Sequence, residues 1–172
     1  LDLHSFPTRR SSDLLGIKNL KGTIDIPSRK KCHSADPEKD LHFMIARLAD
    51  KMPPMLTLID GIFTNEKGPS FDGRIHRRNI LAASTDVFSA DLVGTRLLGL
   101  DPAEVPHLVH AARNRSRPLD LSDVRVVGER IEDLAAPHEY DFAYNESGRL
   151  PKPMEKMGIS GLSYRKYDSS LC

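Results

Sequence analysis

Three aspartates have the side chains best suited to bind a hard metal ion: Asp60, Asp86 and Asp91. Asp60 follows the apolar run 55–59, and Asp91 interrupts the apolar pattern that begins after Asp86. A carboxylate buried among apolar neighbours must be paired or bound to metal. Positions 86 and 91 lie about 140° apart around a helix at about 100° per residue, so a metal site requires Asp60 to converge on them from another element. In the alternative, structural interpretation, Asp86 caps a helix, Asp60 lies in a turn, and Asp91 pairs with an arginine such as Arg96.

A basic segment, residues 16–33, is a second candidate for binding. Its five lysines and arginines against the single acid Asp25 give 5 − 1 = +4. Gly16 and Gly22 flank Lys18 and Lys21, and glycine lets backbone amides turn toward an anion while lysine supplies charge. The segment therefore predicts a phosphate or carboxylate contact, with a solvated basic loop as the alternative. Its spacing is not that of a Walker loop.

Other catalytic and metal-binding motifs are missing from the sequence. There is no GxSxG, HExxH, zinc-type spacing or GxGxxG, so catalytic residues stay unknown. The two cysteines, Cys32 and Cys172, cannot hold an iron–sulfur cluster alone, because a cluster needs about four thiolates. So few cysteines favour a reducing, cytoplasmic compartment. His33 and His42 are expected at the surface.

The elements that must position these residues follow from hydrophobic periodicity. Two short strands, 55–59 and 79–83, are separated by a charged loop, 64–78, and followed by a helix from Asp86 with apolar residues at helical spacing. Further helices are expected from Asp36 and from Asp101, each with proline next, and a short strand at 124–127. Polar residues follow both strands, where open α/β sheets bind ligands.

These patterns predict an α/β fold with a small central sheet, mixed or parallel, flanked by helices. Residues 1–14 share no periodicity with the rest and resemble translated adapter read-through in assembled metagenomic sequence, so we expect a non-native or disordered segment there. Residues 15–135 are expected to form a partial α/β domain, and residues 136–172 an irregular C-terminal tail that is truncated. The chain is thus interpreted as a fragment.

The composition argues against two classes of partner. The 25 lysines and arginines nearly balance 24 acids, giving 25 − 24 = +1, so the overall charge offers no reason to expect nucleic acid or a membrane surface. No apolar run approaches the roughly 20 residues of a membrane span.

Four motifs resemble a known family: KNLKG at 18–22, LIDGI at 58–62, and STDVFSAD at 84–91 followed by LGLDP at 98–102. Over residues 15–128 the chain is similar to the C-terminal half of domain-of-unknown-function family 362. Members of that family often carry ferredoxin-like cysteine motifs and are labelled iron–sulfur proteins. The positions that match the family motifs, and that the resemblance implies for ligand binding, are Lys18, Asn19, Lys21, Asp60, Asp86 and Asp91.

The chain departs from the iron–sulfur members because it lacks their CxxCxxC clusters. Cys172 is a metal ligand only if a cysteine motif continues beyond it, so a cluster is expected only in a full-length protein. The partners implied are a ferredoxin-like segment or an N-terminal half of the domain. The predicted function is a redox-associated or small-anion-binding module; the alternative is a metal-dependent enzyme that uses Asp60, Asp86 and Asp91.

Overall fold

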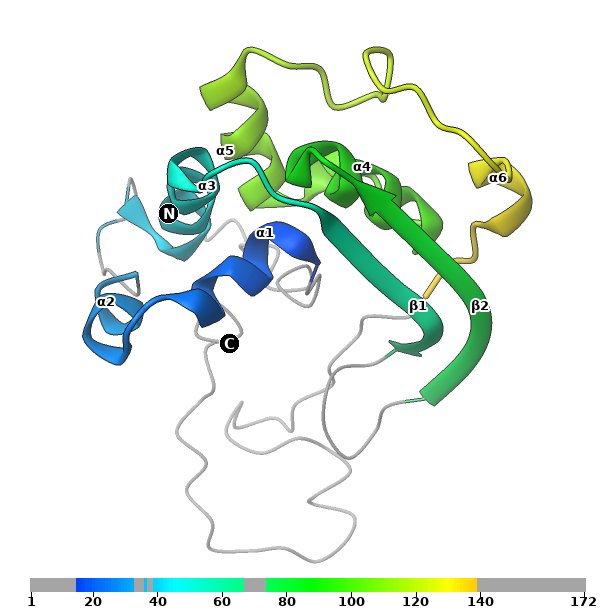
Figure 1. The fold of residues 1–172 in the computed structure, drawn as a ribbon, viewed down its shortest axis with the longest axis horizontal. Coiled ribbons are helices and arrows are strands. Elements are labelled where there is room, and N and C mark those ends of the chain that lie inside the picture. Colours follow the sequence, from blue (N-terminus) through cyan, green and yellow to red (C-terminus); the bar gives the residue numbers. More distant parts are fainter. Residues whose placement is uncertain (1–14, 33–35, 37–38, 67–73, 139–172) are drawn as a thin grey trace, which may run out of the picture.

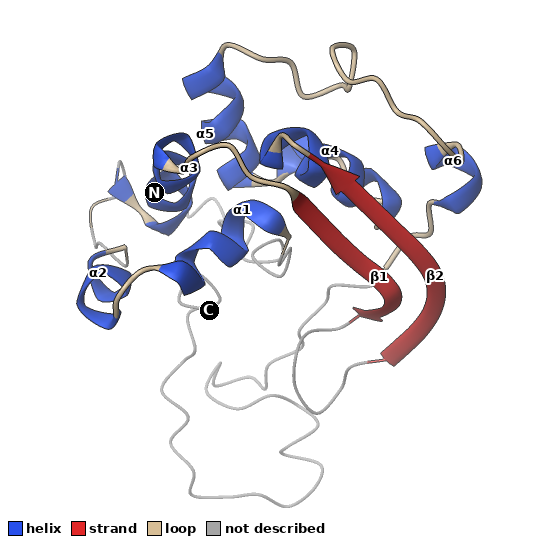
Figure 2. Cartoon of the chain, viewed as in Figure 1, coloured by secondary structure: helices blue, strands red, loops and turns tan. Residues whose placement is uncertain are grey.

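The computed structural model describes residues 15–32, 36, 39–66 and 74–138. The helices are α1 Gly16–Asn19, α2 Ile26–Lys31, α3 Leu41–Lys51, α4 Val87–Leu97, α5 Pro106–Arg115 and α6 Ile131–Leu134; the strands are β1 Thr57–Glu66 and β2 Arg74–Ser84. Helices α1 to α5 gather at one end of a long β-hairpin, and α6 stands apart on the other side of β2 (Figures 1 and 2). Helices with a small sheet confirm the α/β class, and the predicted order of two strands followed by a helix is confirmed.

The sheet consists of β1 and β2 paired antiparallel, from Thr57 opposite Ser84 to Glu66 opposite Arg74. A mixed or parallel sheet was predicted, but residues 67–73 are too few for a parallel crossover, which needs a dozen or more. Both strands are longer than predicted. The predicted loop was therefore too long. Residues 64–66 and 74–78 belong to the strands, because their backbones continue the sheet.

The hairpin has a bulge near its middle. Gly61 pairs with Ile80 and Phe63 with Arg77, so one residue of β1 faces two of β2. One of the two is Asn79, whose φ is 54°, a left-handed conformation that asparagine tolerates better than most residues. The bulge bends the strands, and both curve strongly in Figure 1.

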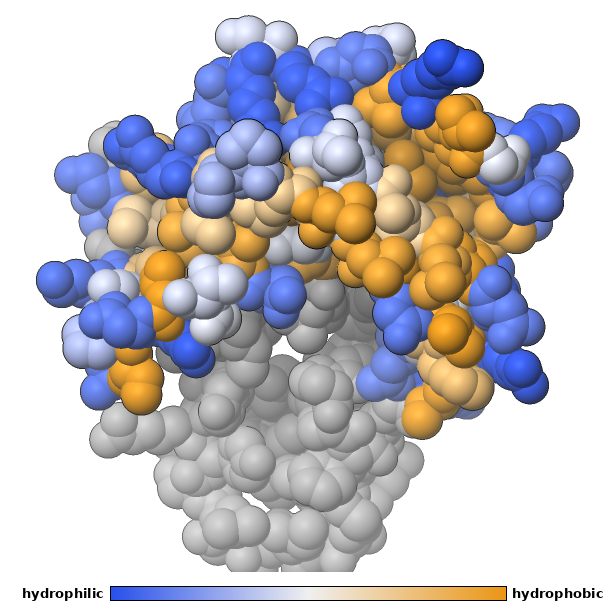
Figure 3. All heavy atoms as spheres, viewed as in Figure 1, coloured by the Kyte–Doolittle hydropathy of each residue, from blue (hydrophilic) through white to orange (hydrophobic). Residues whose placement is uncertain are grey.

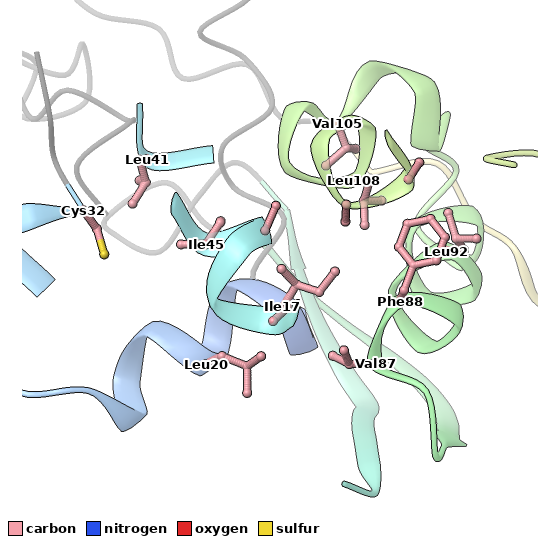
Figure 4. Close-up of a cluster of buried hydrophobic side chains, with 14 residues drawn as sticks. Ile17, Leu20, Cys32, Leu41, Ile45, Val87, Phe88, Leu92, Val105 and Leu108 are labelled. Carbon is pink, nitrogen blue, oxygen red and sulfur yellow. The ribbon is translucent and has the colours of Figure 1, made fainter. Parts of the chain in front are cut away.

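The core lies between the helices (Figure 4). It is centred on the fully buried side chains of Ile17 from α1, Ile45 from α3, Phe88 and Leu92 from α4, and Leu108 from α5. The apolar spacing of α3 predicted Ile45, because side chains three and four residues apart share a helix face. The apolar positions expected after Asp86 began with Val87 and did not include Phe88 or Leu92, which are the fully buried apolar residues of α4. Cys32 is also buried in this cluster.

Three element boundaries differ from the prediction. The helix expected from Asp36 begins at Leu41, because the carboxylate of Asp40 accepts the amide of Phe43 at 2.9 Å and caps it there. Asp101 caps a 3₁₀ turn, Pro102–Glu104, and α5 begins only at Pro106. Residues 124–127 form no strand, since none of the described strands pairs with them and Val127 is 81% exposed. No helix in the described part of the chain has the length and apolar character needed to cross a membrane.

Candidate functional site

Asp91 has no exposed surface and binds the start of α1. Its carboxylate accepts the backbone amide of Gly16 at 2.7 Å and that of Ile17 at 2.9 Å. The first amides of a helix lack partners within the helix and carry a partial positive charge. A carboxylate brought from α4 therefore satisfies them. An arginine such as Arg96 was predicted as the partner of Asp91, but Arg96 pairs with Asp101 at 3.6 Å.

Gly16 must be glycine for this contact to form. A Cβ at position 16 would lie 2.8 Å from Oδ1 of Asp91 and from the Cγ2 of Thr57, and 2.9 Å from the Cγ2 of Val87. The glycine-flanked segment was predicted to bind an anion through its backbone amides. The anion that binds the Gly16 amide is the chain's own Asp91. The segment is also helical, in α1, α2 and the 3₁₀ turn Leu20–Thr23, and the prediction of a loop there is wrong.

Asp86 is the N-cap of α4, as predicted. Its carboxylate accepts the amides of Phe88 and Ser89 and the hydroxyl of Ser89. It also forms ion pairs with Arg115, at 3.1 Å, and with Arg117. Burial raises the pKa of Asp86, but the hydrogen bonds from Ser89 and Arg117 outweigh burial and hold the pKa below its ordinary value. Asp86 is therefore a charged anchor for the arginines.

Asp60 lies within β1 and not at a strand end. It pairs with Leu81 across the sheet, its side chain is exposed, and its Oδ1 accepts the amide of Ile62 at 2.9 Å. The antiparallel sheet also separates the C-terminal ends of its strands, so polar residues after β1 and β2 do not meet at one edge. Among the described residues, no group of three or more His, Cys, Asp and Glu side chains could hold a metal ion.

A polar cluster occupies the far end of the hairpin. Glu66, only 6% exposed, lies 3.2 Å from Nε2 of His76 and 3.7 Å from the guanidinium of Arg74. Nδ1 of His138 lies 2.8 Å from a backbone carbonyl and must donate to it, so Nε2 accepts the Thr64 hydroxyl at 2.6 Å. The contact between Thr64 and His138 and the bond from Arg78 to the Leu134 carbonyl hold residues 134–138 against the sheet.

A second cluster, which sequence analysis missed, joins Lys18 of α1, His42 of α3 and His107 of α5. Lys18 is 4% exposed and His107 is completely buried. The two imidazoles are nearly parallel, 7° apart, with 6.0 Å between ring centroids. Each histidine is the second residue of its helix. We call Lys18, His42 and His107 the basic cluster.

The ring nitrogens of this cluster are short of hydrogen bonds. Both ring nitrogens of His107 and Nδ1 of His42 are buried without a hydrogen-bond partner. Among the described residues, these three atoms are the buried side-chain nitrogens and oxygens that lack one. Burial, followed by the charges of His42, Lys18 and His110, lowers the pKa of His107 to about 3. Burial is also the main reason that the pKa of His42 is lowered, against the opposing effect of Asp40. Both imidazoles are therefore neutral at pH 7.

The other predicted residues of the basic segment have different surroundings. Asn19 is exposed and Lys21 is half-buried, whereas Lys18 is buried. His42 was predicted at the surface because it lies off the apolar stripe of α3; it is half-buried, because α5 packs along that helix and brings His107 to it. The available signal was the position of both histidines at helix starts, next to Asp40 and Pro106. Cys172 and His33 lie outside the described residues.

The chain resembles proteins of one family over its first half. Residues 15–96 match the family model described as domain of unknown function (DUF362), which supports the resemblance drawn from the motifs. Thylakoid-associated protein sll1697 of Synechocystis sp. is 34% identical over 103 residues, which are 59% of this chain and 32% of that relative. The chain therefore spans about a third of the relative's length. No solved structure gives a significant match.

Proposed function

We propose that this domain is a small-anion-binding module of a redox-associated family, and that the basic cluster of Lys18, His42 and His107 is its anion site. The proposal keeps Lys18 from the predicted set of ligands. It replaces the aspartates, because Asp86 and Asp91 already bind groups of the chain itself.

The observation that carries the proposal is the pair of unpartnered nitrogens on the buried ring of His107. A buried polar group without a hydrogen bond costs about 1–3 kcal/mol. Most buried polar groups in native proteins therefore have a hydrogen-bond partner, which is either a protein group or an ordered water molecule. A neutral imidazole offers one N–H donor. A phosphate or carboxylate oxygen accepts such a donor, and the ammonium group of Lys18 attracts the charge.

The surroundings of the cluster favour an anion over a cation. The charges of His42, Lys18 and His110 all oppose protonation of His107, whereas the carboxylate of Asp40 acts on His42 and not on His107. An anion would reverse this effect and raise the pKa of His107. The metal-dependent alternative with Asp60, Asp86 and Asp91 lacks comparable support, since each carboxylate contacts a different part of the chain.

The test is a titration with inorganic phosphate at constant ionic strength, followed by the melting temperature and by NMR of the histidine ring protons. We expect phosphate to raise the melting temperature, since a ligand of the native state stabilises it, and to shift the ring signals of His42 and His107. Lys18→Met and His107→Phe should abolish both effects. Lys30→Met, at an exposed residue of α2, is the matched control and should retain them.

Two outcomes would count against the site. Equal stabilisation of the wild type and of Lys18→Met would place phosphate elsewhere. Unchanged ring signals at saturating phosphate would mean that water satisfies the histidines.

The redox association is a separate part of the proposal and comes from the family resemblance. It requires a cysteine motif in a longer gene product, beginning with Cys172, or a ferredoxin-like partner. Iron and sulfide analysis of that longer product, with its visible absorption spectrum, tests it; a colourless protein without iron would remove the cluster from the proposal.

The cellular location is also proposed and not shown. We propose a cytoplasmic protein, whereas the name of the Synechocystis relative describes that protein as thylakoid-associated. Fractionation of the source cells into soluble and membrane fractions would decide between these locations.

A further inference from the structure

Large apolar side chains are exposed on the part of the hairpin nearest the helices. Leu58 and Leu81 are each 62% exposed. Leu58 pairs with Ala83 and Asp60 with Leu81, so these four residues share one face of the sheet. The opposite face packs on α4, where the Ile59 side chain comes within 3.0 Å of an ideal Cβ at Gly94. The exposed face is therefore the one that α4 leaves uncovered.

The exposed apolar face changes beyond the bulge. Phe63 is 60% exposed and Ile75 is 74% exposed, and their cross-strand partners are Arg77 and Asn65. Alternation along β1 places Phe63 on the face opposite Leu58. Apolar side chains thus emerge from both faces of the hairpin, and apolar residues cover much of this region in Figure 3.

Both strands also have an open edge. The described sheet has only the strands β1 and β2, so each strand has one row of backbone donors and acceptors that faces no other strand. A two-stranded sheet needs further strands or a covering helix for stability, and α4 covers only one face of this sheet. An open edge beside exposed apolar side chains is a surface to which further strands add.

We infer that this hairpin is the docking surface for further β-structure of the same domain, supplied by the part of the longer protein that this chain lacks. The cyanobacterial relative supports this occupant, because the matched region is only 32% of its length. A second copy of the chain fits less well, since a two-fold contact through one face would leave the other face exposed. A membrane surface fits less well because the apolar residues lie on both faces.

The experiment co-expresses this chain with a tagged polypeptide made of the segments of the Synechocystis protein that lie outside the matched 103 residues. We expect a one-to-one complex by size-exclusion chromatography with light scattering, and slower hydrogen exchange along β1 and β2. The relative's own matched segment is the positive control.

Charged substitutions then locate the contact. Leu81→Glu and Phe63→Glu test the two faces and should each weaken binding at least tenfold. Val127→Glu, at an exposed residue outside the hairpin, is the matched control and should bind like the wild type. Circular dichroism of each variant alone checks that it is folded.

Every other outcome overturns the inference. Binding that both hairpin variants retain would place the contact elsewhere. So would the absence of a complex, whether or not the relative's own segment forms one. A dimer of this chain alone that Leu81→Glu dissociates would assign the hairpin to a second copy, and binding to lipid vesicles that the hairpin variants lose would assign it to a membrane.

Discussion

Replacement of Asp91 by alanine tests whether this carboxylate is a structural cap. Asp91→Ala removes the acceptor of the Gly16 and Ile17 amides, and it leaves these donors in a buried site. Asp91 also has contacts beyond these two. We therefore expect Asp91→Ala to weaken the attachment of α1 to α4, two helices that lie far apart in the sequence.

The size of the effect follows from the two hydrogen bonds. A bond to a charged group contributes about 1.5–3 kcal/mol, so two contribute about 3–6 kcal/mol. The whole free energy of unfolding of a domain is about 5–15 kcal/mol. Asp91→Ala should thus remove a large share of the stability, and Asp91→Asn should be milder because its amide oxygen can still accept one bond.

Urea denaturation followed by circular dichroism measures the loss, since the chain has no tryptophan for fluorescence. Asp60→Ala, at an exposed carboxylate, is the control and should shift the midpoint little. Hydrogen exchange of the Gly16 and Ile17 amides should accelerate in Asp91→Asn. A loss in Asp91→Ala below about 1 kcal/mol, the typical effect of any substitution, would refute the structural role and return Asp91 to the list of ligands.

Three further predictions concern pH, charge and backbone conformation. Because the pKa of His107 falls from 6.5 to about 3 on folding, the unfolded chain binds the proton first, and the free energy of unfolding should decrease as pH falls below 6.5, by up to about 1.4 kcal/mol per pH unit. His107→Phe should flatten this slope in urea titrations between these two pH values, and an unchanged slope would contradict the assignment. Arg117→Ala removes ion pairs with Asp86 and Asp123 and a cation–π contact in which the guanidinium lies 4.9 Å from the Phe88 ring centroid. The substitution should lower the free energy of unfolding by about 1–2 kcal/mol and reduce its dependence on salt concentration. Equal salt dependence in the wild type and the variant would argue against this network. Gly99 has φ +73°, and a Cβ there would lie 2.6 Å from Cα of Pro137. Gly99→Ala should therefore lower the free energy of unfolding, measured by thermal denaturation, by about 2–5 kcal/mol. The control is Gly22→Ala, whose Cβ would meet nothing within 4 Å; equal losses of stability in the two variants would show that the approach of Pro137 is unimportant.

The polar cluster at the hairpin end shows how the bulge affects the rest of the chain. The extra residue in β2 shifts the alternation of that strand alone, so Ile75 lies on the same face as Phe63, whereas β1 alternates without interruption. Beyond it, Thr64 and Glu66 become covered while Phe63 and Ile75 become exposed. Residues 134–138 attach to this part of the hairpin through His138 and Arg78. The bulge thus places Ile75 on the face of Phe63, and Arg78 within the bulge binds the C-terminal described segment.

The sequence by itself determined the features that depend on neighbouring residues. The cap at Asp86, the helix that follows it and the apolar stripe of α3 were predicted, because a cap or a stripe involves residues two to four positions apart. The two strands were found only in part: 55–59 overlaps the start of β1, and 79–83 lies in the second half of β2. The remaining strand residues were missed because most of them are polar. The family motifs KNLKG and LIDGI were also legible without a structure.

Only the tertiary structure decided how the functional residues are partnered. Asp91 and Gly16 are 75 positions apart, and the basic cluster takes one residue from each of three helices. The direction of the strand pairing follows from the connection between them and not from their apolar content. Contacts of this kind depend on how the helices pack against one another and against the sheet, and no local pattern of residues records that packing.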